Sequence, residues 1–235
     1  YQSSLHRENL RADLDSKLSV IFNNYGQELI DIEQIYEKNK HSPPIARNMP
    51  PVAGTFTWAR HLLRKIEDPM IKFQGNSSIL STKESKKIIR TYNKVAKTLI
   101  AFEYLWYEAW CSSIEAAKAG LQATLIIRHE KSDKLYVNFD PEIFQLLREA
   151  KCLVKLDIAI PESAKLILLQ EETFKAYYND LKFMLSEYER ITDRIIPVTT
   201  KLLAPYLKTL ELKLRPGLVS LTWTSLNIDQ YKSSI

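Results

Sequence analysis

The residues of this sequence that could take part in catalysis or metal binding are its histidines and cysteines. No two histidines stand four residues apart in an H-E-x-x-H pattern, so we expect no helix-borne metal site. Cys111 and Cys152 are far apart and have no neighbouring ligand spacing, so we expect buried free thiols and no catalytic nucleophile. The four histidines are His6, His41, His61 and His129.

The glycines and carboxylates give no further sign of a catalytic site. The sequence has five glycines, and they are too widely spaced to form either a G-x-x-x-x-G-K-[ST] or a G-x-G-x-x-G motif. The carboxylate pairs Glu171 with Glu172 and Glu187 with Glu189 are expected on the outward faces of helices, where they would be solvated. We therefore predict no catalytic residue, no metal and no cofactor in this chain.

The charge pattern argues against nucleic-acid and membrane binding. The net charge is +5, from 33 basic and 28 acidic residues, and both signs are interspersed along most segments. No apolar run is long enough to cross a bilayer, and no secretory leader is visible, so a soluble intracellular protein is expected. One basic cluster could still meet an acidic partner; it comprises Lys83, Lys86, Lys87, Arg90, Lys94 and Lys97.

Composition and periodicity predict a mainly α protein of successive long-helix bundles with one small β-hairpin. Apolar residues make up 45% of the sequence and glycine is scarce, which favours long helices around a buried core. One apolar seam, with steps of three and four residues, runs from Leu10 to Tyr36. A third long helix is expected from Thr82 to about Ala119, and Gly75 to Ser78 form a polar break before it.

The second predicted helix begins at Pro51 and carries the clearest seam. Proline suits the first turn of a helix, where its missing N–H needs no partner. We expect Arg60, Arg64 and Lys65 on the face opposite the seam, either solvated or meeting acidic groups of a neighbouring bundle, as a possible interaction surface. The predicted seam comprises Val52, Phe56, Ala59, Leu63, Ile66, Met70 and Phe73.

The second half of the chain changes period and then becomes helical again. Alternating residues on both sides of a charged turn predict a β-hairpin at 121–139, which must lie on helices or be completed by a strand from elsewhere in the parent protein or from a partner. The predicted division is therefore a bundle at 1–120, the hairpin, and a second bundle at 140–235. Arg215 to Gly217 is expected to turn the chain into a last segment, in which Trp223 is an anchor and a possible interaction residue.

Four stretches of this sequence resemble the N-terminal tail region of an axonemal dynein heavy chain, most closely the outer-arm type. They are NMPPVAGTFTWARHLLRKIEDPM (48–70), KAGLQATLIIRH (118–129), LYVNFDPEI (135–143) and RPGLVSLTWTSL (215–226). Nearly the whole chain falls inside the resemblance. Because it begins at Tyr1, we expect a piece of a longer protein.

The resemblance implies a structural role. In that family the tail binds intermediate and light chains, associates with other heavy chains, and attaches through a docking complex to doublet microtubules of the ciliary axoneme, within the cytoskeleton. The ATPase would reside in an AAA+ ring outside this chain. Two alternatives are a helical adaptor unrelated to dynein and a helical ligand-binding protein or enzyme with a site among Trp58, Trp106 and Trp110.

Overall fold

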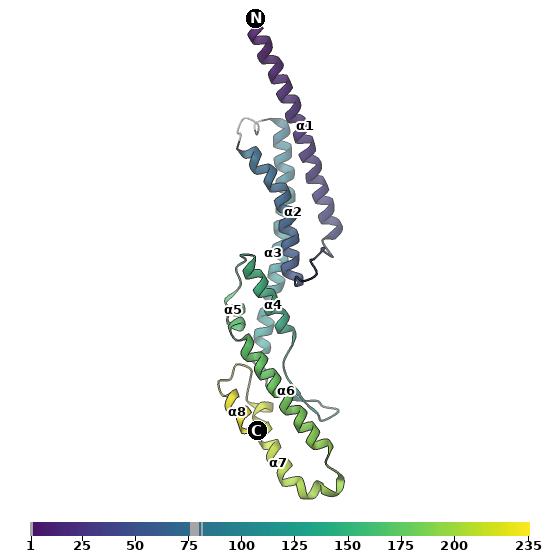
Figure 1. The fold of residues 1–235 in the computed structure, drawn as a ribbon, viewed down its shortest axis with the longest axis vertical. Coiled ribbons are helices and arrows are strands. Elements are labelled where there is room, and N and C mark those ends of the chain that lie inside the picture. Colours follow the sequence, from purple (N-terminus) through teal and green to yellow (C-terminus); the bar gives the residue numbers. More distant parts are fainter. Residues whose placement is uncertain (1, 76–79, 81) are drawn as a thin grey trace. The chain divides into compact units, whose positions relative to one another are not determined.

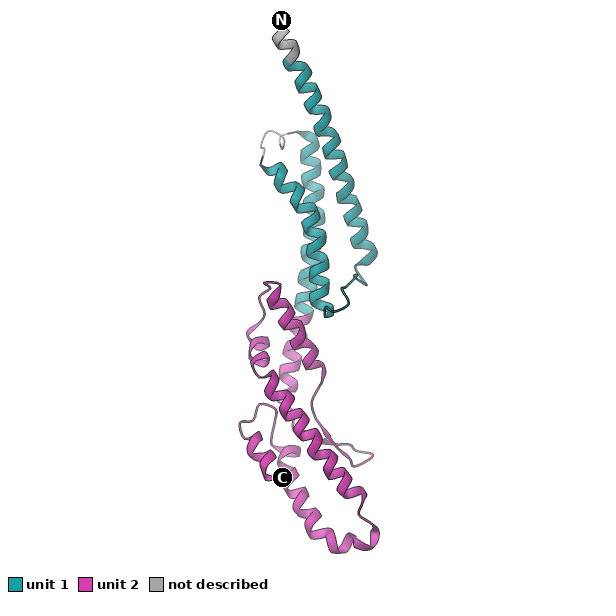
Figure 2. Cartoon of the chain, viewed as in Figure 1, with its two compact units in different colours: residues 1–109 teal, residues 110–235 magenta. Residues whose placement is uncertain are grey.

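A computed structural model describes residues 2–75, 80 and 82–235 (Figure 1). As predicted, the fold is mainly α: the described residues form eight helices and one two-stranded antiparallel hairpin. The chain divides into two compact units, residues 1–109 and 110–235 (Figure 2). The predicted division at 120 and 139 stays a prediction. No helix in the described part of the chain is both long and apolar enough to span a bilayer.

The first unit consists of three helices that lie side by side. They are α1 (Gln2–Asn39), α2 (Pro51–Gln74) and α3 (Lys83–Gly120), the last of which continues into the second unit. One apolar core holds the three together. From α1 it takes Phe22, Tyr25, Leu29 and Ile32; from α2 Trp58, Ala59, Leu62, Ile66 and Met70; and from α3 Ile88, Val95, Ala96, Leu99 and Phe102.

Aromatic rings and one hydroxyl fix how these helices meet. The Trp58 ring packs edge-on against Phe102, with centroids 5.8 Å apart, and stacks on Tyr36 at 6.4 Å. The Tyr25 hydroxyl donates a 2.6 Å hydrogen bond to the carbonyl oxygen of Ile66, joining α1 to α2. Burial, followed by the nearby groups of Tyr92 and Glu28, raises the pKa of Tyr25, so this donor stays protonated at physiological pH.

The proline–glycine motif at the start of α2 has a steric explanation. Pro51 occupies the first turn, as predicted. Gly54 is buried against the preceding loop, where any added Cβ would collide with Cγ2 of Ile45. Glycine is therefore needed here for the close approach of the loop and not for an unusual backbone conformation.

The predicted seam of α2 is partly wrong in phase. Leu62 is buried with 3% of its surface exposed, whereas Leu63 is only half-buried at the margin of the core. Val52 and Phe73 are also half-buried. The core touches α2 from two sides, α1 and α3, so its buried face is wider than one row of residues and is centred away from Leu63.

The predicted seam of α1 is covered in its second half only. Leu10, Leu14 and Ile21 are exposed, and Phe22 is buried in place of Ile21. The buried part starts where α2 and α3 lie alongside α1 (Figure 1). Gly75 caps the end of α2, and the predicted polar break at 76–78 lies outside the described residues.

In the second unit the predicted hairpin is confirmed. Strands β1 (Ile126–Arg128) and β2 (Leu135–Val137) pair antiparallel, with Ile127 opposite Tyr136. The chain extends the sheet itself: Leu125 donates its N–H to the carbonyl oxygen of Leu221 at 3.0 Å, and Thr124 bridges to Thr222. The hairpin also lies on helices, which is the first of the two predicted ways of completing it.

The remaining five helices that the structure describes follow the hairpin in the chain. They are α4 (Glu142–Lys155), α5 (Glu162–Leu169), α6 (Glu171–Asp193), α7 (Pro197–Val219) and α8 (Ile228–Ser234). β2 packs on α6, and β1 packs on α7, which also contacts α8 (Figure 1).

The predicted turn at 215–217 is wrong, because α7 continues through Pro216 to Val219. Pro216 has no N–H to donate to the carbonyl oxygen of Leu212. Because Leu212 is exposed, a water molecule can bind that carbonyl oxygen instead. The helix ends only where Ser220 and Leu221 both donate their N–H groups to the carbonyl oxygen of Pro216. Gly217 is buried, and an added Cβ there would collide with the hydroxyl of Tyr231.

Candidate interaction site

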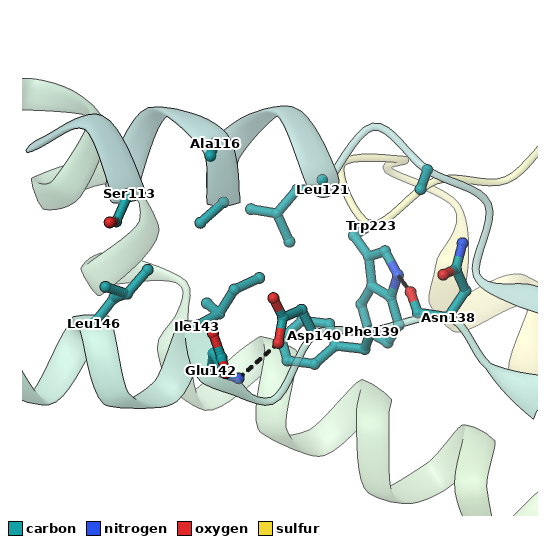
Figure 3. Close-up of a pocket in the computed structure, with 13 residues that line it drawn as sticks. Ser113, Ala116, Leu121, Asn138, Phe139, Asp140, Glu142, Ile143, Leu146 and Trp223 are labelled. Carbon is teal, nitrogen blue, oxygen red and sulfur yellow. Dashed lines mark hydrogen bonds between the residues drawn. The ribbon is translucent and has the colours of Figure 1, made fainter. Parts of the chain in front are cut away.

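The second unit contains a cleft of about 430 Å³ (Figure 3). One wall is the last turns of α3, where the small residues Ser113, Ala116 and Gly120 line the cleft. Ile143 and Leu146 of α4 form the opposite wall. Small residues on one side and branched apolar residues on the other leave room for an inserted side chain.

Trp223 closes one end of this cleft. Its indole Nε1 donates a 2.6 Å hydrogen bond to the carbonyl oxygen of Asn138, just after β2 (Figure 3). The ring packs against Phe139 at 4.6 Å between centroids, and Phe139 in turn contacts Phe144 and Tyr178. Only 2% of Trp223 is exposed, so it joins the last segment of the chain to the hairpin and presents little surface of its own.

Two carboxylate residues, Asp140 and Glu142, line the cleft. Asp140 Oδ1 accepts a 2.9 Å hydrogen bond from the backbone N–H of Glu142, at the start of α4 (Figure 3). The residues lining the cleft include no histidine, lysine or arginine. A phosphate group would meet only like charge there, so the cleft suits an apolar or basic side chain better than a nucleotide.

The three basic residues predicted on the outward face of α2 do not share one environment. The Arg60 guanidinium pairs with both carboxylate oxygens of Glu103 on α3, with Nη2 to Oε1 at 2.9 Å and Nε to Oε2 at 3.3 Å. Arg64 and Lys65 are exposed. Arg60 thus meets an acidic group within its own unit, whereas an interaction surface at Arg64 and Lys65 stays a prediction.

One predicted surface carboxylate is instead buried. Glu171 is 7% exposed and lies between the ammonium groups of Lys151 on α4 and Lys175 on α6, each at 2.6 Å. Burial alone would raise the pKa of Glu171, but the hydrogen bonds and charges of the two lysines outweigh it and lower the pKa. Glu172 is exposed as predicted, and Glu189 pairs with Lys134 of the hairpin.

The other predicted reactive residues stay apart. Cys111 and Cys152 form no disulfide with each other, and both are half-buried, not fully buried as predicted. No three histidine, cysteine, aspartate or glutamate side chains converge as metal ligands in the described part of the chain. Trp58 and Trp106 pack edge-on against Phe102, which places both rings in aromatic packing.

Sequence reasoning missed the cleft because it forms only when α4 packs opposite the end of α3 and Trp223, distant in the chain, closes one end. The only local signal is the spacing of small residues at the end of α3, which by itself resembles ordinary helix packing. The buried position of Glu171 was likewise hidden, since it depends on Lys151 of another helix.

Comparison with known proteins places the chain in a family. Residues 1–231 match the family model described as "Dynein heavy chain, N-terminal region 1". Over 231 residues the chain is 51% identical to the dynein gamma chain of the flagellar outer arm of Chlamydomonas reinhardtii, covering 98% of this chain and 5% of that one.

Two mammalian proteins are also similar. Dynein axonemal heavy chain 5 of Mus musculus is 41% identical over 218 residues, or 93% of this chain and 5% of its own length. Dynein axonemal heavy chain 8 of Homo sapiens is 39% identical over 222 residues, or 94% and 5%. The chain therefore spans about 5% of the length of these relatives.

Proposed function

Because the chain belongs to the dynein heavy chains and corresponds to part of their N-terminal region, we propose that it is a non-catalytic tail segment of an axonemal, outer-arm heavy chain. The predicted resemblance is confirmed, and an adaptor unrelated to dynein is thereby ruled out. The names of the relatives support a place in the ciliary axoneme, within the cytoskeleton. The ATPase of the motor would then lie outside these residues.

The proposed role is that of a strut. The observation that carries it is the shared core of α1, α2 and α3, because three long helices packed through one core resist bending better than separate helices. α1 and α3 have 38 residues each, which corresponds to about 57 Å per helix at 1.5 Å per residue. Such a bundle can transmit force and present side faces to other subunits.

The partners we propose are the intermediate and light chains of the motor, neighbouring heavy chains, and the docking complex on doublet microtubules. The exposed apolar residues of α1 support this proposal, because Leu10, Leu14 and Ile21 continue the same seam that is buried further along the helix. A partner helix could cover them as α2 and α3 cover the rest. No nucleic-acid or membrane partner is proposed.

Deletion of this segment from the full heavy chain in a ciliated cell would test the strut. We expect a purified motor that keeps its ATPase activity but is no longer found on isolated axonemes with its intermediate and light chains. Normal assembly on the axoneme would overturn the proposal. In parallel, the 235-residue chain should show no nucleotide hydrolysis above buffer, and measurable turnover would contradict its non-catalytic assignment.

A further inference from the structure

α7 carries an exposed apolar row that the described chain leaves uncovered. Val198, Pro205, Leu212 and Val219 recur every seven residues, and all four are exposed, Val198 by 87%. A seven-residue spacing keeps side chains on nearly the same face of a helix. Leu202 and Tyr206, also largely exposed, widen this face on one side.

A basic row runs beside the apolar one. Lys201, Lys208 and Arg215 also recur every seven residues, each three positions after a member of the apolar row, and all are exposed. None of the three forms an ion pair with the part of the chain that the structure describes. The two rows together, with Leu202 and Tyr206, are named the α7 strip.

The opposite face of α7 is the one held by the unit. Within the described residues Leu214 and Gly217 are the buried residues of this helix, and both lie in its last two turns. Gly217 meets Tyr231 of α8 and Ile126 of β1. The helix is thus anchored at its end and on one side, which leaves the α7 strip available along its length.

We propose that the α7 strip is a docking surface for an acidic amphipathic helix of a second polypeptide in the motor complex. The inference rests on the proposed tail function and adds a surface and the chemistry of its partner. The apolar row would pack against the seam of the partner helix, and the basic row calls for Asp or Glu at seven-residue spacing along the edge of that helix. From Val198 to Val219 the strip is about 32 Å long at 1.5 Å per residue, which matches three heptads of a partner.

A protein helix fits the strip better than a lipid surface does. Membrane-surface helices bury a broad apolar face rich in Trp, Phe and Leu. The α7 strip is narrower: its apolar row has one residue per heptad, one of them Pro205, and only Leu202 and Tyr206 lie beside that row. A regular alternation of apolar and basic positions instead fixes where a partner helix binds along the strip, whereas a fluid headgroup layer has no fixed positions to match it.

Site-specific photo-cross-linking in the assembled motor tests this proposal. A benzophenone amino acid would replace Leu202 in the full heavy chain, and a matched control would carry it at Thr200, which is exposed on another face of the same helix. We expect cross-links from position 202, but not from 200, to an acidic helical peptide of another subunit. Adducts with lipid, with the same heavy chain, or at neither position would overturn the proposal.

Reversing the charge of the basic row is the second part of the test. We expect the triple variant Lys201→Glu, Lys208→Glu and Arg215→Glu to lower the cross-linking yield from position 202 by roughly tenfold, summing modest contributions of three exposed pairs. Raised salt should weaken the wild-type yield in the same direction. The matched control reverses three exposed lysines elsewhere in the unit: Lys131, Lys155 and Lys182.

The outcomes separate this inference from the proposed function. If deletion of the whole segment abolishes assembly but the triple variant cross-links like wild type, the docking surface is wrong and the strut stands. If deletion leaves assembly intact, the strut itself fails. Circular dichroism of the variant chain confirms that a lost cross-link does not reflect unfolding.

Discussion

Truncation of Leu62 and of its neighbour Leu63 to alanine tests how α2 is oriented in its bundle. Leu62 is 3% exposed within the core shared by three helices, so Leu62→Ala removes a buried side chain and leaves a cavity. We expect a loss of about 3 kcal/mol in the free energy of unfolding. Leu63 lies at the margin of the core, where part of the transfer free energy was never gained, and Leu63→Ala should cost about 1 kcal/mol.

Hydrogen exchange of the α2 amides is the suitable measurement, because two units need not unfold in one step. The opening free energy of α2 should fall about 2 kcal/mol further in Leu62→Ala than in Leu63→Ala. The two leucines are identical in chemistry and adjacent in sequence, so helix propensity cancels between the variants. Equal losses, or a larger loss at Leu63, would refute the orientation of α2 described here.

Three further expectations concern the second unit. Gly217→Ala should destabilise the second unit by more than about 1 kcal/mol, because the new methyl group collides with the Tyr231 hydroxyl. In the control Gly120→Ala the new methyl group meets no atom within 4 Å, so this variant should be neutral or stabilising in thermal melts. Glu171→Gln should lower stability near pH 7. Because the folded-state pKa of Glu171 is lowered, the stabilisation by its carboxylate is present above the unfolded-state pKa and is lost as the pH falls through the folded-state pKa, so the melting temperatures of wild type and variant should converge below about pH 4. The control Glu172→Gln should show little pH-dependent difference. Burial raises the pKa of Tyr231 to about 12, and its hydroxyl donates a 3.0 Å hydrogen bond to the Leu214 carbonyl oxygen. Tyr231→Phe should therefore cost about 1–2 kcal/mol of stability. A spectrophotometric titration in which every tyrosine ionises near pH 10 would contradict the burial of Tyr231.

Periodicity alone predicted the long helices of the first unit and the hairpin of the second. The three-and-four spacing reports that a helix has an apolar face, but its phase is set by the neighbours. Leu62 and Leu63 differ by about 100° around α2, and the sequence spacing is compatible with burial of either one. Only the packing of both α1 and α3 against α2 decides which leucine is buried. For the same reason the exposed start of α1 could not be told from its buried end.

The errors in the second unit come from contacts distant in sequence. Pro216 and Gly217 carry the ordinary signature of a turn, yet the helix persists because Tyr231 of α8 packs onto Gly217. Glu171 has the composition of a solvated position and becomes buried only when α4 brings Lys151 alongside. Local chemistry does suffice at Asp140, whose side chain accepts from the Glu142 N–H as is usual for an aspartate at a helix N-terminus.

The bond between the Trp223 indole and the Asn138 carbonyl oxygen joins residues 85 positions apart, which has a consequence during synthesis. At about 5–20 residues per second a ribosome needs roughly 4 to 17 s to travel that distance. Throughout this interval the nascent hairpin lacks both the 221–222 backbone that extends its sheet and the indole that covers Phe139. A translating polysome would therefore display an open strand edge beside an aromatic cluster, which is the kind of surface that chaperones bind.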